Sequence, residues 1–198
     1  MRLNTAESRL SEADYLEGER DGQLRHELID GVAYAMTGAS DKHNKIAVNL
    51  TFQLMAALRK KGSGCFPYSM DMKVKVQNDF YYPDVMVVCD RQDHESDYYK
   101  THPVVIVEVL SPGTRRIDKT LKRQAYQSLE SLQEYVLVEQ DKAEIEVFTR
   151  QSGWQAAYYY LGDTIHFESI DASISVEDIY YQVDNDDVLA FIQQKQQS

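Results

Sequence analysis

The chain has 198 residues, of which 43% are hydrophobic and 27% charged, as in ordinary globular proteins. We expect a single domain over residues 1–198, with a core of about residues 10–180 and a C-terminal tail at 186–198. The formal net charge of −11 argues against broad, non-specific nucleic-acid binding, because such binding relies on Lys and Arg neutralising phosphates.

The sequence predicts a cytoplasmic protein without a membrane span. No apolar run approaches the roughly 18 residues of a membrane-spanning helix, and residues 1–7 contain no hydrophobic signal core. Cys65 and Cys89 are the only cysteines and lack metal-ligand spacing. We therefore expect reduced cysteines, with Cys89 a buried free thiol at the end of an apolar run.

The first third of the chain predicts a helix, a hairpin and a second helix. Residues 5–18 favour a short helix with Ser11 as its N-cap. Residues 24–36 favour a hairpin, because the pair Asp30-Gly31 suits a type I′ turn. Residues 40–61 favour a long helix that Ser40 or Asp41 caps and Gly62 ends, with an apolar stripe of Ile46, Leu50, Leu54 and Leu58.

Short strands are expected next. Residues 63–76 predict two, of which the second, with Lys73 and Lys75 alternating with valines, fits an outer strand with one wet face. The apolar runs 85–88 and 104–110 predict buried strands. Residues 90–103 join them and form a long loop, which predicts a flap. Its acidic and histidine residues favour a solvated loop, with a metal cluster as the alternative; they are Asp93, His94, Glu95 and Asp97.

A helix follows near residues 117–129, and its apolar stripe should dock on the sheet; the stripe is Ile117, Leu121, Ala125 and Leu129. Strands are expected at 134–138, 144–149, 154–161 and 165–170, and a short helix or turn at 176–183. The tyrosines at 158–160 favour edge or core packing over base stacking. A helical segment at 188–193 precedes a frayed end. The whole predicts an α/β (α+β) fold, with a mixed central sheet of about five to seven strands flanked by helices.

Charged residues stand at unusual places in these central elements. Asp84 begins the first apolar run and Glu108 lies inside the second. If the two runs pair antiparallel, both carboxylates come to the same end of the sheet, where they favour a shared proton or a cation between them. Asp118, Lys122 and Tyr126, spaced at i, i+4 and i+8, share one helix face, from which Lys122 could reach the acids.

This ordered set resembles the PD-(D/E)XK nuclease superfamily, and more closely its Uma-type family of restriction endonucleases. The resemblance covers about residues 10–180, and it is carried by residues 26–31, His43, Pro83-Asp84, residues 108–112, the series Asp118, Lys122 and Tyr126, and the strand at 134–138. It implies a restriction-endonuclease-like fold and a hydrolase that uses Mg²⁺ or Mn²⁺. DNA is the implied substrate, with RNA left open, and the resemblance suggests a homodimer.

The resemblance also implies roles for individual residues. Asp84, Glu108 and Lys122 would be catalytic; Asp84, Glu108 and the backbone carbonyl of Val109 would bind the metal; Glu27, His43, Asp118 and Tyr126 would support them. The superfamily lysine normally stands two residues after the glutamate, where this chain has Leu110, so the lysine is displaced to the following helix.

Structural interpretations of the same residues, without a catalytic role, stay open at this point. Glu27 would be a surface strand residue paired with Arg25 or a lysine, and His43 a structural, hydrogen-bonded histidine. The basic residues of the helix form either a local patch beside the site or an ordinary solvated surface; they are Arg115, Arg116, Lys119, Lys122 and Arg123. The low pI and Leu110 support an alternative, in which the chain is a catalytically inactive interaction protein with a nuclease fold.

Overall fold

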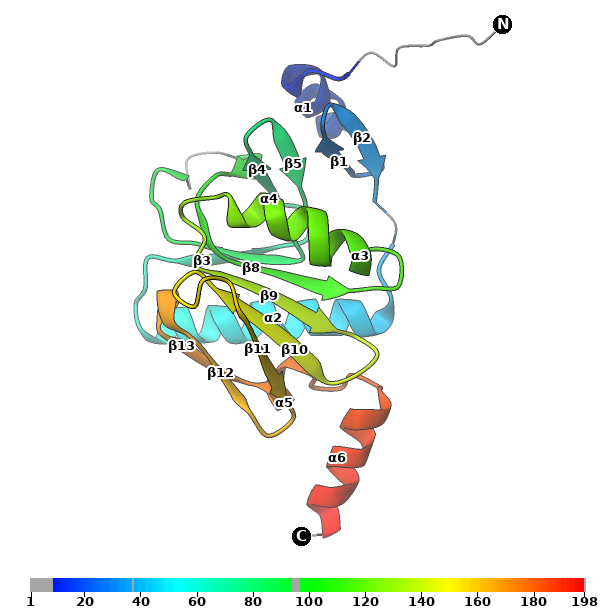
Figure 1. The fold of residues 1–198 in the computed structure, drawn as a ribbon, viewed down its shortest axis with the longest axis vertical. Helices are drawn as coiled ribbons and strands as arrows, with labels where there is room; N and C mark the ends of the chain where they lie inside the picture. The colour runs from blue at the N-terminus through cyan, green and yellow to red at the C-terminus, as the bar shows by residue number, and fades with distance from the viewer. Residues whose placement is uncertain (1–8, 37, 94–96, 198) are drawn as a thin grey trace, which may run out of the picture.

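The computed structural model describes residues 9–36, 38–93 and 97–197. A six-stranded mixed sheet crosses the molecule in the order β11 (Ala156–Tyr160), β10 (Glu144–Thr149), β9 (Glu134–Glu139), β8 (Pro103–Leu110), β6 (Val85–Val88) and β3 (Phe66–Ser69) (Figure 1). The β8–β9 pair is parallel and the other pairs are antiparallel. The predicted mixed sheet with flanking helices is confirmed.

Two smaller sheets complete the fold. A five-stranded sheet has the order β2 (Val32–Ala35), β1 (His26–Ile29), β5 (Asp79–Tyr81), β4 (Lys73–Val76) and β7 (Tyr99–Lys100). It lies with helix α1 (Glu12–Asp21) near the N-terminal end of the molecule in Figure 1. A hairpin of β12 (Thr164–Phe167) and β13 (Ala172–Ser175) lies below the main sheet, joined by the 3-10 turn η3 (Glu168–Ile170).

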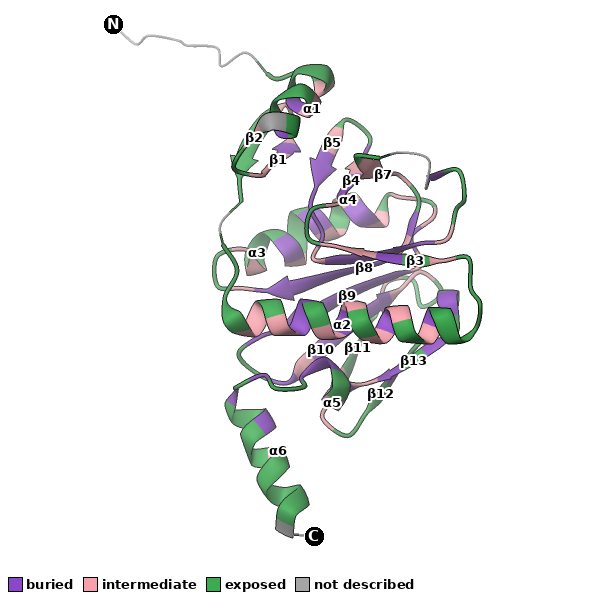
Figure 2. Cartoon of the chain, turned by 180° about the vertical axis from the view of Figure 1, so that it is seen from behind, coloured by how far each residue is buried: buried purple, intermediate pink, exposed green. Residues whose placement is uncertain are grey.

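Helices cover both faces of the six-stranded sheet. Helix α2 (Asp41–Lys60) lies behind it, together with α5 (Val176–Ile179); in front run α3 (Arg115–Ile117), the π-helical turn η2 (Asp118–Lys122) and α4 (Arg123–Gln127) (Figures 1 and 2). Strand alternation divides the core accordingly. Val107 and Val109 pack in the cluster that contains the α2 side chains, whereas Ile106 and Leu110 pack with Tyr126 of α4. Glu108 therefore lies on the α4 face, between two core residues.

Local signals placed the N-terminal elements well. Ser11 caps α1 by accepting a hydrogen bond from the Asp14 N–H, although the helix runs over 12–21 rather than 5–18. The hairpin turns at Asp30 and Gly31, which have φ of 53° and 76°, as a type I′ turn requires. Helix α2 begins at the predicted Ser40 cap and is followed by Gly62 at φ 62°.

Other expectations were wrong. Strand β4 is an inner strand between β5 and β7, and Lys73 on it is buried. In the 90–103 loop, Asp93 is also buried, where it accepts hydrogen bonds from the N–H groups of Thr101 and His102. His94 and Glu95 lie outside the described residues. The short strands β5, β7 and β13 were not predicted.

The cysteines form a disulfide, which overturns the expectation of a buried free thiol. Strands β3 and β6 pair antiparallel with Phe66 opposite Val88, so the adjoining Cys65 and Cys89 face each other across the sheet. At the C-terminus, helix α6 (Asp186–Gln197) extends through most of the segment expected to be frayed. Among the described residues, no helix has both the length and the apolar character that crossing a bilayer requires.

Candidate active site

Asp84 is held where strand β6 begins. The β6–β8 register pairs Val85 with Val107 and so brings Asp84 beside Glu108. Asp84 Oδ2 accepts a hydrogen bond from the Val109 N–H at 2.7 Å, and Oδ1 lies 2.8 Å from His43 Nε2. Burial lowers the pKa of His43, but the hydrogen bond and charge of Asp84 raise it by more, so the net shift is upward. His43 thus lines the site and is hydrogen-bonded there.

Glu108 is almost fully buried, with 3% of its surface exposed. Its Oε1 accepts a hydrogen bond from the Tyr126 hydroxyl at 2.8 Å and lies 3.3 Å from Lys122 Nζ. Burial raises the pKa of Glu108 well above its ordinary value; Lys122 opposes the shift, whereas the nearby acids, Asp118 first among them, add to it. Within the described part of the chain, both protein donors fall on Oε1, so Oε2 stays open to another ligand.

Lys122 is the cation of the cluster. Its Nζ lies 2.8 Å from Glu27 Oε1, 3.3 Å from Glu108 Oε1 and 3.6 Å from Asp118 Oδ1. Burial lowers the pKa of Lys122, but the charges of Glu108, Glu27 and Asp118 outweigh burial and raise it overall. The amine therefore stays protonated at physiological pH.

The helix that carries Lys122 docks with the face next to the predicted apolar stripe, and of that stripe only Ala125 and Leu129 pack against the core. Ile117 and Leu121 are 44% and 42% exposed, whereas Asp118, Lys122 and Tyr126 are buried against the sheet. The charged face can be buried because Lys122 meets carboxylates from other elements, which offset its desolvation. Residues 118–122 form a π-helical turn, a feature common at functional sites, and the Tyr135 hydroxyl donates to the Asp118 carbonyl there at 3.0 Å.

Glu27 reaches this cluster from strand β1 of the other sheet. Besides Lys122, its Oε1 accepts a hydrogen bond from the Tyr82 N–H at 3.1 Å. The interpretation of Glu27 as a surface residue was wrong, and Arg25 pairs with Asp71 instead. The site is thus assembled from both sheets, α2 and the η2 turn.

The donors of the cluster fit a hard divalent cation. Glu27, Glu108 and Asp118 surround the Lys122 ammonium, and Asp84, beside Glu108, pairs with His43, so the fully ionised cluster has an excess of negative charge. Asp118 Oδ1 is buried and makes no hydrogen bond with the described residues. Burial also raises the pKa of Asp118, and the charge of Lys122 opposes this upward shift. Such oxygen-rich, under-neutralised sites suit Mg²⁺ or Mn²⁺.

Comparison with known proteins identifies the family of this chain. The Uma2 family model, described as "Putative restriction endonuclease", matches residues 12–177. The chain belongs to the Uma2 family. The predicted resemblance is therefore confirmed, and the matched residues include all of the described strands and all of the acidic residues of the cluster, whereas α6 lies beyond them.

Two Synechocystis proteins are similar to this Uma2 chain. "Uncharacterized protein slr1290" is 35% identical over 176 residues, covering 87% of this chain and 92% of its own length. "Uncharacterized protein sll1609" is 32% identical over 133 residues, covering 66% of this chain and 75% of its own. A solved structure from Anabaena variabilis, described as a "putative nuclease belonging to DUF820", superposes with a TM-score of 0.71 at 14% identity. It covers 86% of this chain and 97% of its own, and at this identity it shows a shared fold.

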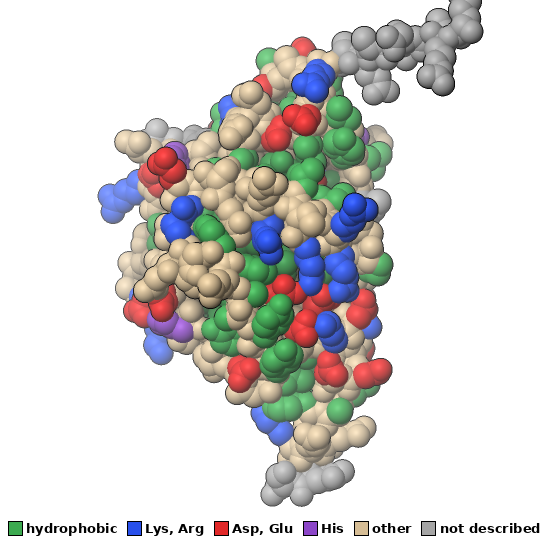
Figure 3. Space-filling view, in the orientation of Figure 1, with side chains coloured by type: hydrophobic (Ala, Val, Ile, Leu, Met, Phe, Trp, Pro, Cys, Tyr) green, Lys and Arg blue, Asp and Glu red, His purple; other side chains and the backbone are tan. Residues whose placement is uncertain are grey.

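The basic residues beside the Uma2 site are partly neutralised. Figure 3 shows Lys and Arg side chains over α3 and α4 with acidic side chains directly beside them. Arg115 forms an ion pair with Glu139, and Lys119 with Glu146. The local basic patch is therefore weaker than the residue types alone indicate.

Two backbone N–H groups that hold carboxylates of the site could not be predicted from the sequence. The N–H of Val109 holds Asp84, and the N–H of Tyr82 holds Glu27. Every residue except Pro carries such a donor, so only the strand register shows which of them meets a carboxylate.

Proposed function

We propose that this chain is a Mg²⁺-dependent endonuclease, active also with Mn²⁺, that hydrolyses phosphodiester bonds of DNA. One observation carries the proposal: Asp84 and Glu108 are held side by side on neighbouring strands, with the protonated Lys122 at 3.3 Å from Glu108. Glu108 is buried with a raised pKa, so binding a cation there would relieve an unfavourable charge.

The chemistry divides between a cation and the side chains. Asp84, Glu108 and the Val109 carbonyl would hold the ion, which supplies a water of lowered pKa and offsets charge on the phosphate. Lys122 cannot accept a proton, because its acidic neighbours keep it charged. It would instead donate N–H groups to a phosphate oxygen or to the attacking water. Asp118 and Tyr126 are positioning residues that hold Lys122 and Glu108 in place.

The burial of Glu108 argues against an inactive interaction protein. Such a protein needs no carboxylate at this core position, and a solvated Glu108 would suit it better. Glu108 is 3% exposed and faces three further carboxylates in the same cluster. Charge retained in the core without a ligand destabilises the fold, which favours a role in binding.

A nicking assay tests the proposal. Supercoiled plasmid and a matched RNA are incubated with Mg²⁺, Mn²⁺ or EDTA and with wild type, Asp84→Asn, Glu108→Gln or the exposed control Glu17→Gln. We expect metal-dependent nicking by wild type and control, and a loss of at least a hundredfold in the two site variants, equivalent to about 2.7 kcal/mol of barrier. Equal nicking by all four proteins would overturn the assignment. Size-exclusion chromatography tests the expected homodimer.

A further inference from the structure

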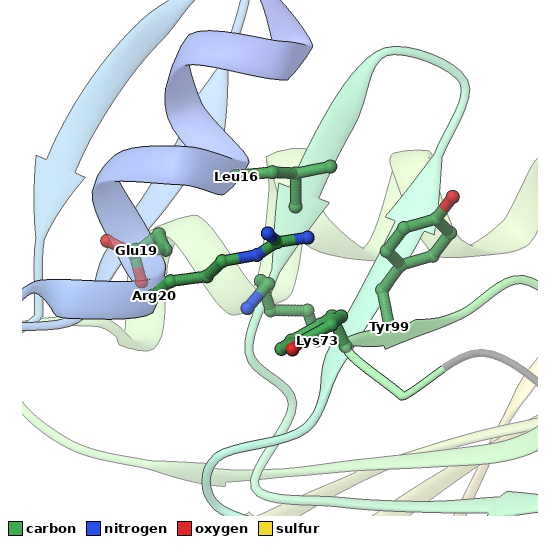
Figure 4. Close-up of a pocket in the computed structure, with 6 residues that line it drawn as sticks. Leu16, Glu19, Arg20, Lys73 and Tyr99 are labelled. Carbon is green, nitrogen blue, oxygen red and sulfur yellow. The ribbon is translucent and has the colours of Figure 1, made fainter.

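A cavity of about 340 Å³ lies beside the five-stranded sheet, under helix α1. Its lining residues are Leu16, Glu19, Arg20, Lys73, Tyr98 and Tyr99. In Figure 4 the Arg20 guanidinium extends between Leu16 and Lys73, and Tyr99 stands across from it. The volume is at the small end for ligand-binding cavities, which suits one compact ligand rather than an extended one.

Lys73 gives the cavity a buried cation. It is 7% exposed, and within the described part of the chain its ammonium makes one hydrogen bond, to the Tyr82 hydroxyl at 3.2 Å, and no ion pair. Burial lowers the pKa of Lys73, and the nearby charge of Glu19 opposes this shift without cancelling it. An ammonium has three donors, so two remain for an anion that enters the cavity.

The remaining lining groups define the ligand further. Arg20 places a second cation there, stacked over the Tyr98 ring at 4.7 Å from its centroid. Glu19 also lines the cavity, and its two carboxylate oxygens accept hydrogen bonds from the Tyr82 hydroxyl at 2.7 Å and the His26 N–H at 3.1 Å, so the lining carries two cations and one carboxylate. Two cations beside an exposed aromatic ring suit a phosphate joined to a flat ring, as in a nucleotide.

Tyr82 connects the cavity to the candidate active site. Its hydroxyl bonds to Lys73 and Glu19, and its backbone N–H bonds to Glu27, which contacts Lys122. Tyr82 is also only two residues before Asp84. Tyr82 thus links residues of the cavity lining to the acidic cluster, and both could contact neighbouring parts of one nucleic-acid strand.

We propose that this cavity binds a nucleotide that flanks the cleaved bond, with Lys73 and Arg20 holding its phosphate and Tyr98 stacking on its base. This proposal rests on the proposed nuclease function for the identity of the strand. The subsite would position single-stranded or frayed nucleic acid, because a base can stack on Tyr98 only when it is unpaired.

Calorimetric titration in EDTA tests the subsite without any catalysis. The probes are thymidine 5′-monophosphate, thymidine and inorganic phosphate, and the proteins are wild type, Lys73→Met, Arg20→Gln, Tyr98→Ala and the exposed control Lys60→Met. We expect the nucleotide to bind more tightly than either fragment. The three cavity variants should weaken it at least tenfold, with the control unchanged. Arg20 and Tyr98 are exposed, so their variants stay informative if Lys73→Met fails to fold.

The outcomes separate the two proposals. Nucleotide binding that the variants weaken, in a protein that never nicks plasmid, supports the subsite and removes the nuclease. Nicking with no nucleotide binding, or with binding that the variants leave unchanged, removes the subsite and keeps the nuclease. Equal binding of inorganic phosphate and the nucleotide reduces the cavity to a simple anion site and overturns its assignment to a nucleotide.

Discussion

Replacing Lys122 with Met tests whether one ammonium holds the acidic cluster together. The substitution keeps most of the apolar stem and removes the charge that lies 2.8 Å from Glu27 and 3.3 Å from Glu108. It leaves those carboxylates and Asp118 facing one another in a buried site. Removing one partner of a buried ion pair typically destabilises a protein by about 3–5 kcal/mol, and we expect a loss in this range at pH 8.

The loss should depend on pH in a definite direction. The folded pKa of Glu108 is raised, so the stability that this group contributes falls as pH rises through the region above about 4.5. Lys122 opposes that rise, and its removal moves the pKa of Glu108 further upward. The pKa of Lys122 is itself raised, so the lysine is charged at both pH 5 and pH 8, and any difference between the two pH values comes from the ionisation of its carboxylate partners. The variant should therefore lose more stability at pH 8 than at pH 5, where protonated carboxylates no longer repel.

Urea denaturation followed by circular dichroism measures both effects. With a slope of about 2 kcal/mol per molar urea, a loss of about 4 kcal/mol moves the midpoint down by about 2 M. Lys60→Met, an exposed lysine replacement on α2, should stay within about 0.5 kcal/mol of wild type at both pH values. The reasoning is refuted if Lys122→Met matches wild type at pH 8, or if its deficit is larger at pH 5.

Two further changes probe single contacts. Tyr126→Phe removes the hydroxyl that donates to Glu108 at 2.8 Å and should lower the free energy of unfolding by about 1.5–3 kcal/mol in urea titration, whereas Tyr160→Phe on the exposed edge should be neutral. A reducing agent should destabilise wild type by about 2–4 kcal/mol, because the Cys65–Cys89 bond closes a loop with a sequence separation of 24; a Cys65→Ser, Cys89→Ser double variant that still responds to the reductant would contradict this.

The sequence predicts those elements whose determinants are local. The β-branched runs became β6 and β8, the Asp30-Gly31 pair became the hairpin turn, and Ser40 became the cap of α2, because each depends on a few neighbouring residues. Strands β5 and β7 have three and two residues, too short for a periodic pattern to show. Their sheet, and with it the inner position of Lys73, depends on pairing between segments far apart in the chain.

The docking face of the Lys122 helix shows a different limit. Counting apolar residues placed Ile117 and Leu121 against the sheet, since charged faces normally face water. The prediction failed for Ile117 and Leu121 and held for Ala125 and Leu129, because the counterions that draw Lys122 inward come from positions 27 and 108, on two strands of different sheets. The superfamily resemblance had already pointed to the correct side, since a lysine displaced from position 110 has to reach Glu108 from the helix.

The burial of this charged helix face bears on function. Glu108 occupies a core position between Ile106 and Leu110, and Lys122 a buried helix position, where apolar residues of similar size would often make the fold equally stable or more stable. Fold stability therefore does not explain why Glu108 and Lys122 are charged residues. The excess of carboxylates over ammonium groups in the cluster is unfavourable without a further cation, and under the proposed function a divalent ion would supply the missing positive charge where Asp84 and Glu108 meet. Mg²⁺ should then restore part of the stability that Lys122→Met removes, because the freed carboxylates bind the ion in place of the lost ammonium.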